Sequence, residues 1–207
     1  MNEEPIGAWL DALASSAPAP GGGAAGALEV AIAAALVEMV CNLTIGKPAY
    51  AAHEATMTEA RDRAGGIRGT AVGLAAEDAA AFDAVIAGYR LPRETDAEVE
   101  ARKDAIQAAL ATAADVPRRT AAAASEVLDL AERIVAGANP NVVSDAAAAA
   151  GAARGALQAS LVNIDANRAS IADAALRDEL DETTRTIERD LVRADGIVEA
   201  VRERMAG

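Results

Sequence analysis

Apolar and helix-forming residues recur along the chain in long stretches, and turn residues interrupt them at only a few points. Alanine, leucine, glutamate and arginine dominate, while β-branched runs are short and aromatic residues make up 2%. This composition favours helices over strands. The interruptions predict helices over about 2–15, 23–45, 49–87, 95–114, 116–137, 144–167 and 170–205. The pattern therefore predicts an all-α, single-domain bundle of six to eight helices, several of them long, that spans residues 1–207.

Local signals predict where three of these helices begin. Asn2 stands before two glutamates and a proline, which is typical of a capped helix start. Thr95 and Glu98 have the spacing of a capping box. Pro117 predicts a new helix that starts at 116–117, because proline fits the first turn of a helix and disrupts its interior.

Composition and charge exclude several classes of protein. The chain carries a net charge of −13, which argues against a general nucleic-acid binder, since such a protein needs a basic face. Its 52% apolar share excludes a disordered acidic tail. With one cysteine, Cys41, and one histidine, His53, it has neither a disulfide framework nor a Cys/His metal site. We expect Cys41 in the core and His53 on the surface.

The most apolar stretch, 24–43, is interpreted as a helix of the protein and not as a membrane span. Glu29 and Glu38 lie within it, and each is costly in hydrocarbon. The first residues are acidic, where a signal peptide would be basic. We therefore expect no membrane partner and a cytoplasmic location.

The 58 alanines have a consequence for assembly. Small side chains allow helices to approach closely but bury little apolar area each, so a monomer gains little hydrophobic stabilisation per residue. Burial of the apolar faces of 24–43 and 146–164 in a subunit interface would compensate. We therefore expect a homodimer.

The segment Pro18-Ala19-Pro20-Gly21-Gly22-Gly23 is the most unusual local feature. One interpretation is a tight turn that lets two helices cross closely. The other is a binding site, because successive glycines expose backbone amides at a helix N-terminus, where the macrodipole favours an anion or an electron-rich group. It is not a P-loop, since the Lys-Ser/Thr pair is missing.

A few polar residues are candidates for chemistry, and each has a structural alternative. Lys47 either answers the C-terminal end of a helix dipole or binds a substrate carboxylate or donates a proton. Asp78 lies in an otherwise apolar stretch, and a buried carboxylate is costly unless it is paired or used. Asn163 and Asn167 share one helix face and either bridge helices or bind the edge of a heterocycle. Asp145, with the serine before it at 144, is most simply a helix cap.

Taken together, these segments resemble the cyclodeaminase/cyclohydrolase family of one-carbon folate metabolism. That family includes the cyclodeaminase domain of formiminotransferase-cyclodeaminase and the stand-alone bacterial methenyltetrahydrofolate cyclohydrolases. The matching segments occur in family order over about 8–173: LDALASSAPAPGGG at 10–23, AALVEMVCNLTIGK at 34–47, Asp78-x-x-x-Phe82, Leu91-Pro92-Arg93-x-Thr95, Asn139-x-Asn141-Val142-Val143-Ser144-Asp145 and Asn163-x-x-x-Asn167.

The resemblance implies a helical homodimer without a metal or redox cofactor, whose substrate is a tetrahydrofolate derivative. It implies catalytic roles for Asp78 and Lys47. It implies a substrate-binding role for Pro20, Gly21, Gly22, Gly23, Asn42, Asp145, Asn163 and Asn167. The chain departs from the family pattern at Pro48, where a second basic residue is common, and at Glu29 and Asp165, which add negative charge.

The activity implied by the resemblance is the hydrolysis of 5,10-methenyltetrahydrofolate to 10-formyltetrahydrofolate. Two alternatives stay open at this point. One is the related cyclodeaminase reaction, in which a 5-formimino carbon closes onto N10 and ammonia leaves. The other is a non-catalytic helical dimer that binds folate. The sequence has no fused formiminotransferase domain, which favours the cyclohydrolase.

Overall fold

The computed structural model describes residues 5–206, which form six α-helices and two short 3₁₀ helices and contain no strand. These elements are α1 (Ile6–Leu13), α2 (Gly22–Asn42), η1 (Pro48–His53), α3 (Glu54–Tyr89), α4 (Asp96–Val135), η2 (Pro140–Val142), α5 (Val143–Arg168) and α6 (Ala174–Ala206). The all-α prediction is therefore confirmed. The predicted cap at Asn2 lies outside the described residues.

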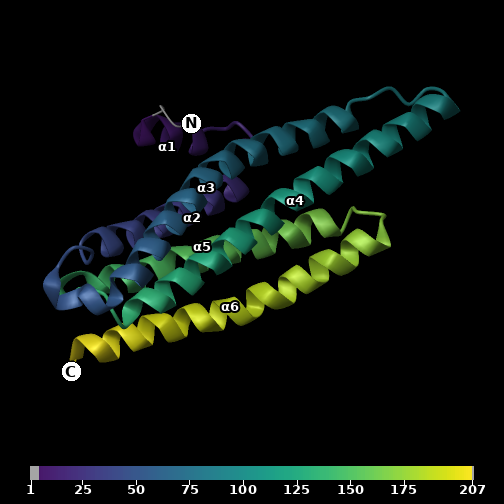
Figure 1. Cartoon of the computed structure of the whole chain (residues 1–207). Helices are drawn as coiled ribbons and strands as arrows, with labels where there is room; N and C mark the ends of the chain where they lie inside the picture. The colour runs from purple at the N-terminus through teal and green to yellow at the C-terminus, as the bar shows by residue number, and fades with distance from the viewer. Residues whose placement is uncertain (1–4, 207) are drawn as a thin grey trace.

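The long helices pack in two layers (Figure 1). Helices α3, α4 and α6 lie in front in this view, and α2 and α5 lie behind them. Helix α2 packs against α3, α4 and α5, and α5 packs against α2, α4 and α6. Close approach depends on small residues, because a Cβ at Gly26 would lie only 2.9 Å from the Cβ of Ala159. The alanine-rich sequence thus favours helices packed close together.

Helix α2 is apolar because it lies at the centre of this packing. Among the described helices it alone is long and apolar enough to span a membrane, with a mean hydropathy of 1.9 over its most apolar window. Ten of its residues are buried against the other helices. Cys41 is one of them, and burial raises the pKa of its thiol to about 11. The predictions of a buried Cys41 and an exposed His53 are both confirmed.

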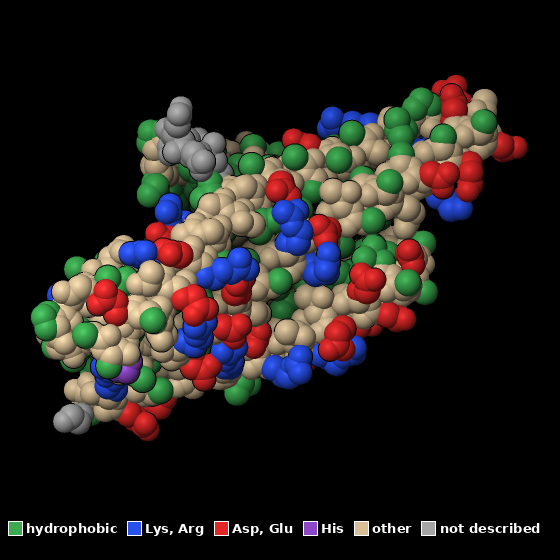
Figure 2. Space-filling view, in the orientation of Figure 1, with side chains coloured by type: hydrophobic (Ala, Val, Ile, Leu, Met, Phe, Trp, Pro, Cys, Tyr) green, Lys and Arg blue, Asp and Glu red, His purple; other side chains and the backbone are tan. Residues whose placement is uncertain are grey.

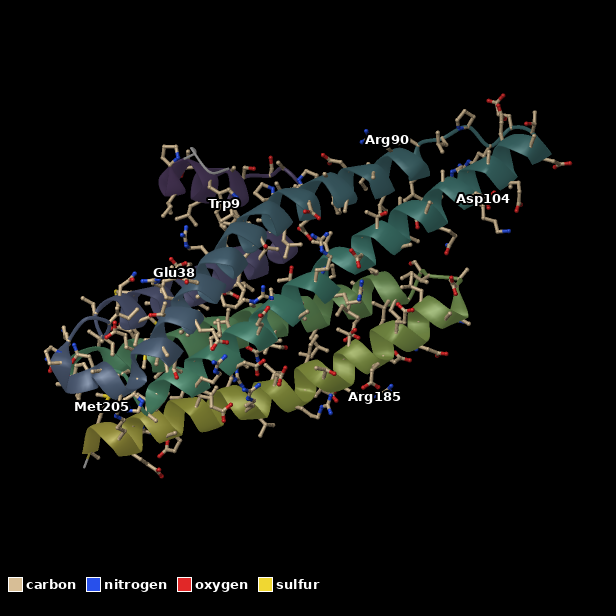
Figure 3. The ribbon with its side chains drawn as sticks, viewed as in Figure 1. Trp9, Glu38, Arg90, Asp104, Arg185 and Met205 are labelled. Atoms are coloured by element: carbon tan, nitrogen blue, oxygen red, sulfur yellow. The ribbon has the colours of Figure 1, made fainter. Side chains whose placement is uncertain are left out.

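The end of α3 and the start of α4 form an arm that extends beyond the other helices. Figure 3 shows Arg90 and Asp104 on this arm. The predicted capping box at its tip is confirmed: the Thr95 hydroxyl accepts a hydrogen bond from the Glu98 amide at 3.3 Å, and the Glu98 carboxylate accepts one from the Thr95 amide at 2.9 Å. The cap fixes where α4 begins.

The predicted helix boundary at Pro117 is wrong, because α4 runs without a break from Asp96 to Val135. Proline has no amide hydrogen, so the carbonyl of Ala113, four residues earlier, loses its helical donor. The side-chain Nδ2 of Asn167 on α5 donates to that carbonyl at 3.1 Å. A tertiary hydrogen bond thus takes the place of the missing backbone one.

The predicted cap at 144–145 is also wrong, because α5 begins one residue earlier, at Val143, without a side-chain cap. The turn before α5 is instead held by Asn139, which is buried, with 4% of its surface exposed. Its side-chain oxygen accepts from the Asn141 amide at 3.1 Å, and its Nδ2 donates to the Leu43 carbonyl at 3.1 Å. Asn139 therefore ties the end of α2 to the start of α5. Asp145 lies half-buried in the first turn of α5.

Candidate functional site

A pocket of about 290 Å³ lies where α2 begins, at the base of the arm. It is formed by the loop before α2, the later part of α3, one residue of α4 and the C-terminal part of α5. Its lining residues are Pro18, Ala19, Gly21, Gly22, Gly23, Asp78, Ala81, Phe82, Val85, Ala113, Asn163 and Asn167. The pocket thus gathers residues from four segments that are far apart in the sequence.

Asp78 caps α2 from another helix. The N-cap position of α2 is Gly21, which has no side chain to accept a hydrogen bond from the first-turn amides. The carboxylate of Asp78 on α3 accepts from the Ala24 amide at 2.9 Å instead. An N-cap side chain normally accepts from this position of the first turn. The same hydrogen bond therefore starts α2 and fixes one oxygen of the carboxylate at the pocket wall.

Burial raises the pKa of Asp78, and the hydrogen bond from the Ala24 amide lowers it by less. The dominant cause is desolvation, which disfavours the charged carboxylate. A carboxyl group with a raised pKa is better suited to take up and return a proton near neutral pH than an ordinary exposed aspartate.

Gly22 and Gly23 differ in how much room they leave for a side chain. A Cβ at Gly23 would lie 2.0 Å from the Oδ1 of Asp78, so only glycine permits the carboxylate to approach this closely. A Cβ at Gly22 would meet its nearest atom, the Nδ2 of Asn163, at 3.8 Å, an ordinary contact. The amides of Gly22 and Gly23 belong to the first turn, where no carbonyl of the helix can accept from them. Close approach and exposed amides therefore occur in the same segment.

Asn163 and Asn167 both line the pocket, and the amino group of each donates to a backbone carbonyl. The Nδ2 of Asn163 donates to the Ala159 carbonyl at 2.8 Å, and that of Asn167 donates to the Ala113 carbonyl at 3.1 Å. Each orientation leaves the carbonyl oxygen of the side chain as an acceptor. Asn167 therefore bridges two helices, as one interpretation of the pair predicts, and both residues line the pocket.

The other predicted site residues lie at the opposite end of α2. Asn42 and Lys47 are exposed there, and Asp145 is placed at the same end by the contact of Asn139 with the end of α2. Because α2 has 21 residues, at about 1.5 Å per residue this end lies about 30 Å from the triple glycine. Within one chain, the expected catalytic residues Asp78 and Lys47 are therefore not brought together. Pro20 adjoins the pocket without lining it.

The apolar wall of the pocket was given no role from the sequence, although Phe82 belongs to one of the matching motifs. Phe82 and Val85 on α3 and Ala113 on α4 line it. A signal was present for Phe82, because it is the only phenylalanine of the chain and stands four residues after Asp78, on the same helix face. The contribution of Ala113 depends on the packing of α4 against α5, and no local pattern indicates it.

Both the sequence and the fold of this chain match known proteins. The family model described as formiminotransferase-cyclodeaminase matches residues 5–186, most of the chain. This chain belongs to the formiminotransferase-cyclodeaminase family.

Individual relatives agree with this assignment. The family member "Methenyltetrahydrofolate cyclohydrolase" of Methylorubrum extorquens is 46% identical over 176 residues, which cover 85% of each chain. A solved structure of formiminotetrahydrofolate cyclodeaminase from Thermotoga maritima superimposes with a TM-score of 0.84 at 28% identity and covers 100% of this chain and 98% of that one. The formimidoyltransferase-cyclodeaminase of Rattus norvegicus is 26% identical over 83% of this chain, which corresponds to 32% of that longer protein.

Replacing Gly23 tests the close approach of Asp78. Gly23→Ala places a methyl group inside the contact distance of the carboxylate, so we expect a loss of about 1–3 kcal/mol in the free energy of unfolding, as in other overpacked sites. The matched variant Gly22→Ala has room for its methyl group, and we expect its stability to be unchanged or higher by up to about 1 kcal/mol. Chemical denaturation of both variants measures this. Equal stabilities would contradict the close contact.

The hydrogen bond between Asn167 and Ala113 can be tested with a double-mutant cycle. Asn167→Ala leaves the Ala113 carbonyl without a donor, and we expect a cost of about 1–2 kcal/mol. In a Pro117→Ala background a backbone amide replaces the lost donor, so the same change should cost less than about 0.5 kcal/mol. Asn163→Ala is the control, since its cost should be the same in both backgrounds. Equal costs for Asn167→Ala in the two backgrounds would show that Pro117 and Asn167 are not coupled.

Proposed function

We propose that this protein hydrolyses 5,10-methenyltetrahydrofolate to 10-formyltetrahydrofolate. The observation that carries the proposal is the half-buried carboxylate of Asp78, held at the wall of a pocket by the Ala24 amide. The 46% identity to a methenyltetrahydrofolate cyclohydrolase over 85% of the chain supports the same reaction.

The chemistry needs a carboxylate of this kind. In the substrate one carbon bridges N5 and N10 as an amidinium cation, which a nearby carboxylate stabilises. A water molecule attacks that carbon while Asp78 takes one of its protons, so that a neutral tetrahedral adduct forms. The bond from the carbon to N5 then breaks, Asp78 returns its proton to N5, and the hydroxyl of the adduct loses its proton to solvent. The products are 10-formyltetrahydrofolate and one proton.

The remaining pocket residues bind and orient the substrate in this proposal. The first-turn amides of α2 donate to a substrate oxygen, and the side-chain oxygens of Asn163 and Asn167 accept from the amino and ring N–H groups of the pterin. Phe82 and Val85 supply an apolar wall for the flat ring. The attacked carbon is already cationic, so the proposed step uses no metal or redox cofactor.

A homodimer is part of this proposal. Support comes from the side of α2 that faces away from α4 and α5, which carries exposed apolar residues such as Ile32 and Met39. Apolar side chains in a row on one helix face are typical of a helix that packs against a partner.

Cyclodeamination is the second candidate function. It is favoured by the likeness of the whole fold to the formiminotetrahydrofolate cyclodeaminase of Thermotoga maritima, at a TM-score of 0.84. The two reactions are told apart by substrate. Loss of the methenyl absorbance without ammonia identifies the cyclohydrolase, and release of ammonia from 5-formiminotetrahydrofolate identifies the cyclodeaminase.

Asp78→Asn tests the proposed base. Asparagine keeps an oxygen for the Ala24 amide but cannot take a proton, so we expect the rate of methenyl decay to fall by about 10²–10⁴-fold. The control is Asp83→Asn, five residues further along α3 at an exposed position on a different face of the helix, which should retain full activity. Absorbance decay, corrected for spontaneous hydrolysis, measures both. Full activity in the Asp78 variant would show that another group is the base.

The raised pKa of Asp78 predicts opposite pH dependences for activity and stability. Activity requires the ionised form, so it should fall as the pH drops through the raised pKa, above the range of an ordinary aspartate. A carboxyl whose pKa is raised by folding stabilises the fold while it is protonated, and that contribution is lost as the pH rises through the folded pKa. The thermal stability of Asp78→Asn should therefore equal or exceed that of the wild type at pH 7. A clearly less stable variant there would contradict the direction of the shift.

A further inference from the structure

The pocket is closed at one end and open at the other. At the closed end, Leu74 and Ala75 on α3 and Val116 on α4 are buried in one cluster with Trp9 and the start of α2. At the other end, α3 and α4 continue into the arm, where the side chains are more exposed, and Phe82 is 39% exposed. A substrate longer than the pocket therefore has room to extend toward the arm.

The pocket face of α3 continues into the arm. Asp78, Phe82, Val85 and Tyr89 are spaced by four, three and four residues, which places them on one face of the helix. The first three line the pocket, and Tyr89 follows one turn later with 48% of its surface exposed. The Tyr89 ring therefore extends the apolar wall beyond the pocket.

Arg102 on α4 lies against this ring. Its guanidinium carbon is 5.7 Å from the centre of the Tyr89 ring, which is a cation–π distance. Its Nη2 donates to the Tyr89 carbonyl at 3.1 Å. Arg102 also lies on the side of α4 that carries the pocket residue Ala113, because the two are eleven residues apart, or about three turns. The pair thus lies where the pocket wall meets the arm.

Arg102 has hydrogen-bond donors that the protein does not use. It is partly buried and forms no ion pair with any of the described residues. Glu98, one turn before it on α4, already accepts from the amides of Glu94 and Thr95. The Nε of Arg102 is buried without a partner, and its Nη1 has no acceptor in the described part of the chain. A guanidinium is a planar fork that matches a carboxylate, so Arg102 is suited to an anionic ligand.

The arm offers no better position for an anion. Figure 2 shows acidic side chains gathered at its tip, and Glu94, Asp96 and Glu100 are exposed there. Arg90 and Arg93 are exposed between α3 and α4, where water and salt screen their charges. The charge of a partly buried group is screened less. Arg102 is therefore the stronger partner for a carboxylate.

The proposed substrate carries carboxylates at a matching distance. In 5,10-methenyltetrahydrofolate, nine bonds separate the methenyl carbon from the α-carboxylate carbon and eleven from the γ-carboxylate carbon, about 10–13 Å when extended. A contact of about 3 Å at each end brings the span to about 16–19 Å. Tyr89 is eleven residues from Asp78, or about 16 Å along α3. With the methenyl carbon at Asp78, a glutamate carboxylate therefore reaches Arg102.

We propose that Tyr89 and Arg102 bind the tail of the substrate. The p-aminobenzoyl ring packs on Tyr89, and the guanidinium of Arg102 donates to a glutamate carboxylate. This rests on the proposed function, because it assigns the pair to the tail of a folate. The pocket at Asp78 binds the reacting end of the molecule, and the pair at the base of the arm selects for its tail.

Two substrates that differ only in the tail test the role of Arg102. One is 5,10-methenyltetrahydrofolate, and the other is its analogue in which a methylamide replaces the glutamate. Arg102→Met keeps most of the side-chain length and removes the charge. We expect KM for the folate to rise about 10–100-fold, the worth of a hydrogen bond to a charged group, while kcat stays within about twofold. KM for the analogue should not change.

Two further variants separate binding of the tail from a structural role. Lys103→Met removes the same charge at the neighbouring exposed position and should leave KM for both substrates unchanged. Arg102→Lys keeps the charge without the planar fork and should restore part of the affinity for the folate. A folate KM that does not change in Arg102→Met, or a KM that rises equally for both substrates, would overturn the proposal.

Tyr89 is tested by its ring. Tyr89→Phe keeps the ring and should behave as the wild type. Tyr89→Ala removes it and should raise KM about 2–10-fold for both substrates, because both contain the benzoyl ring. An unchanged KM in Tyr89→Ala would show that the ring of the substrate does not pack there.

Equilibrium binding distinguishes a failure of this proposal from a failure of the proposed function. Tetrahydrofolate and its methylamide analogue are titrated into the wild type and Arg102→Met, so no turnover is needed. The wild type should bind tetrahydrofolate at least about tenfold more tightly than the analogue, and Arg102→Met should bind the two equally. The comparison within the wild type remains decisive if Arg102→Met does not fold.

Each outcome of the titration decides one of the two proposals. A wild type that prefers tetrahydrofolate but acts on neither folate substrate would overturn the proposed function and leave the tail site standing. A wild type that hydrolyses the methenyl substrate but binds both ligands equally would overturn the tail site alone. Binding of neither ligand, without activity, would overturn both.

Discussion

The hydrogen bond from the Ala24 amide to Asp78 is the interaction on which the site depends. It joins the start of α2 to the middle of α3, and it does so across a contact that only glycine at position 23 permits. The bond caps a helix that lacks its own cap, and it also orients a carboxylate whose burial raises its pKa. In the proposed mechanism, the group that caps α2 is therefore also the base. The energetic cost of burying the carboxylate is partly offset by the capping bond.

Much of the fold follows from local patterns. The helix positions, the capping box at Thr95 and the buried Cys41 were predictable because each depends on residues close in sequence. The errors at Pro117 and Ser144 have one cause. In both places a side chain makes a hydrogen bond to a distant segment: Asn167 donates to the Ala113 carbonyl of α4, and Asn139 donates to the Leu43 carbonyl at the end of α2. Tertiary bonds of this kind leave no periodic signal.

The sequence predicted which types of residue form the site, but it did not predict how they are arranged in space. The triple glycine, Asp78 and the two asparagines do meet in one pocket, as expected. Lys47, Asn42 and Asp145 had been expected at the same site, and within one chain they lie at the other end of α2. Spacing along a sequence says which residues share a helix face, but it does not say which helix ends lie together. Val85 and Ala113 were missed because apolar lining residues look the same as core residues in a sequence, and Phe82 was matched in a motif without a role.

The proline inside α4 also constrains how this sequence can change. Positions 117 and 167 are separated by 50 residues, yet one removes a backbone donor and the other replaces it. A homologue with a non-proline residue at 117 no longer needs asparagine at 167 for the integrity of α4, so only ligand binding would preserve it there. Covariation of these two positions across the family would therefore separate conservation for folding from conservation for binding.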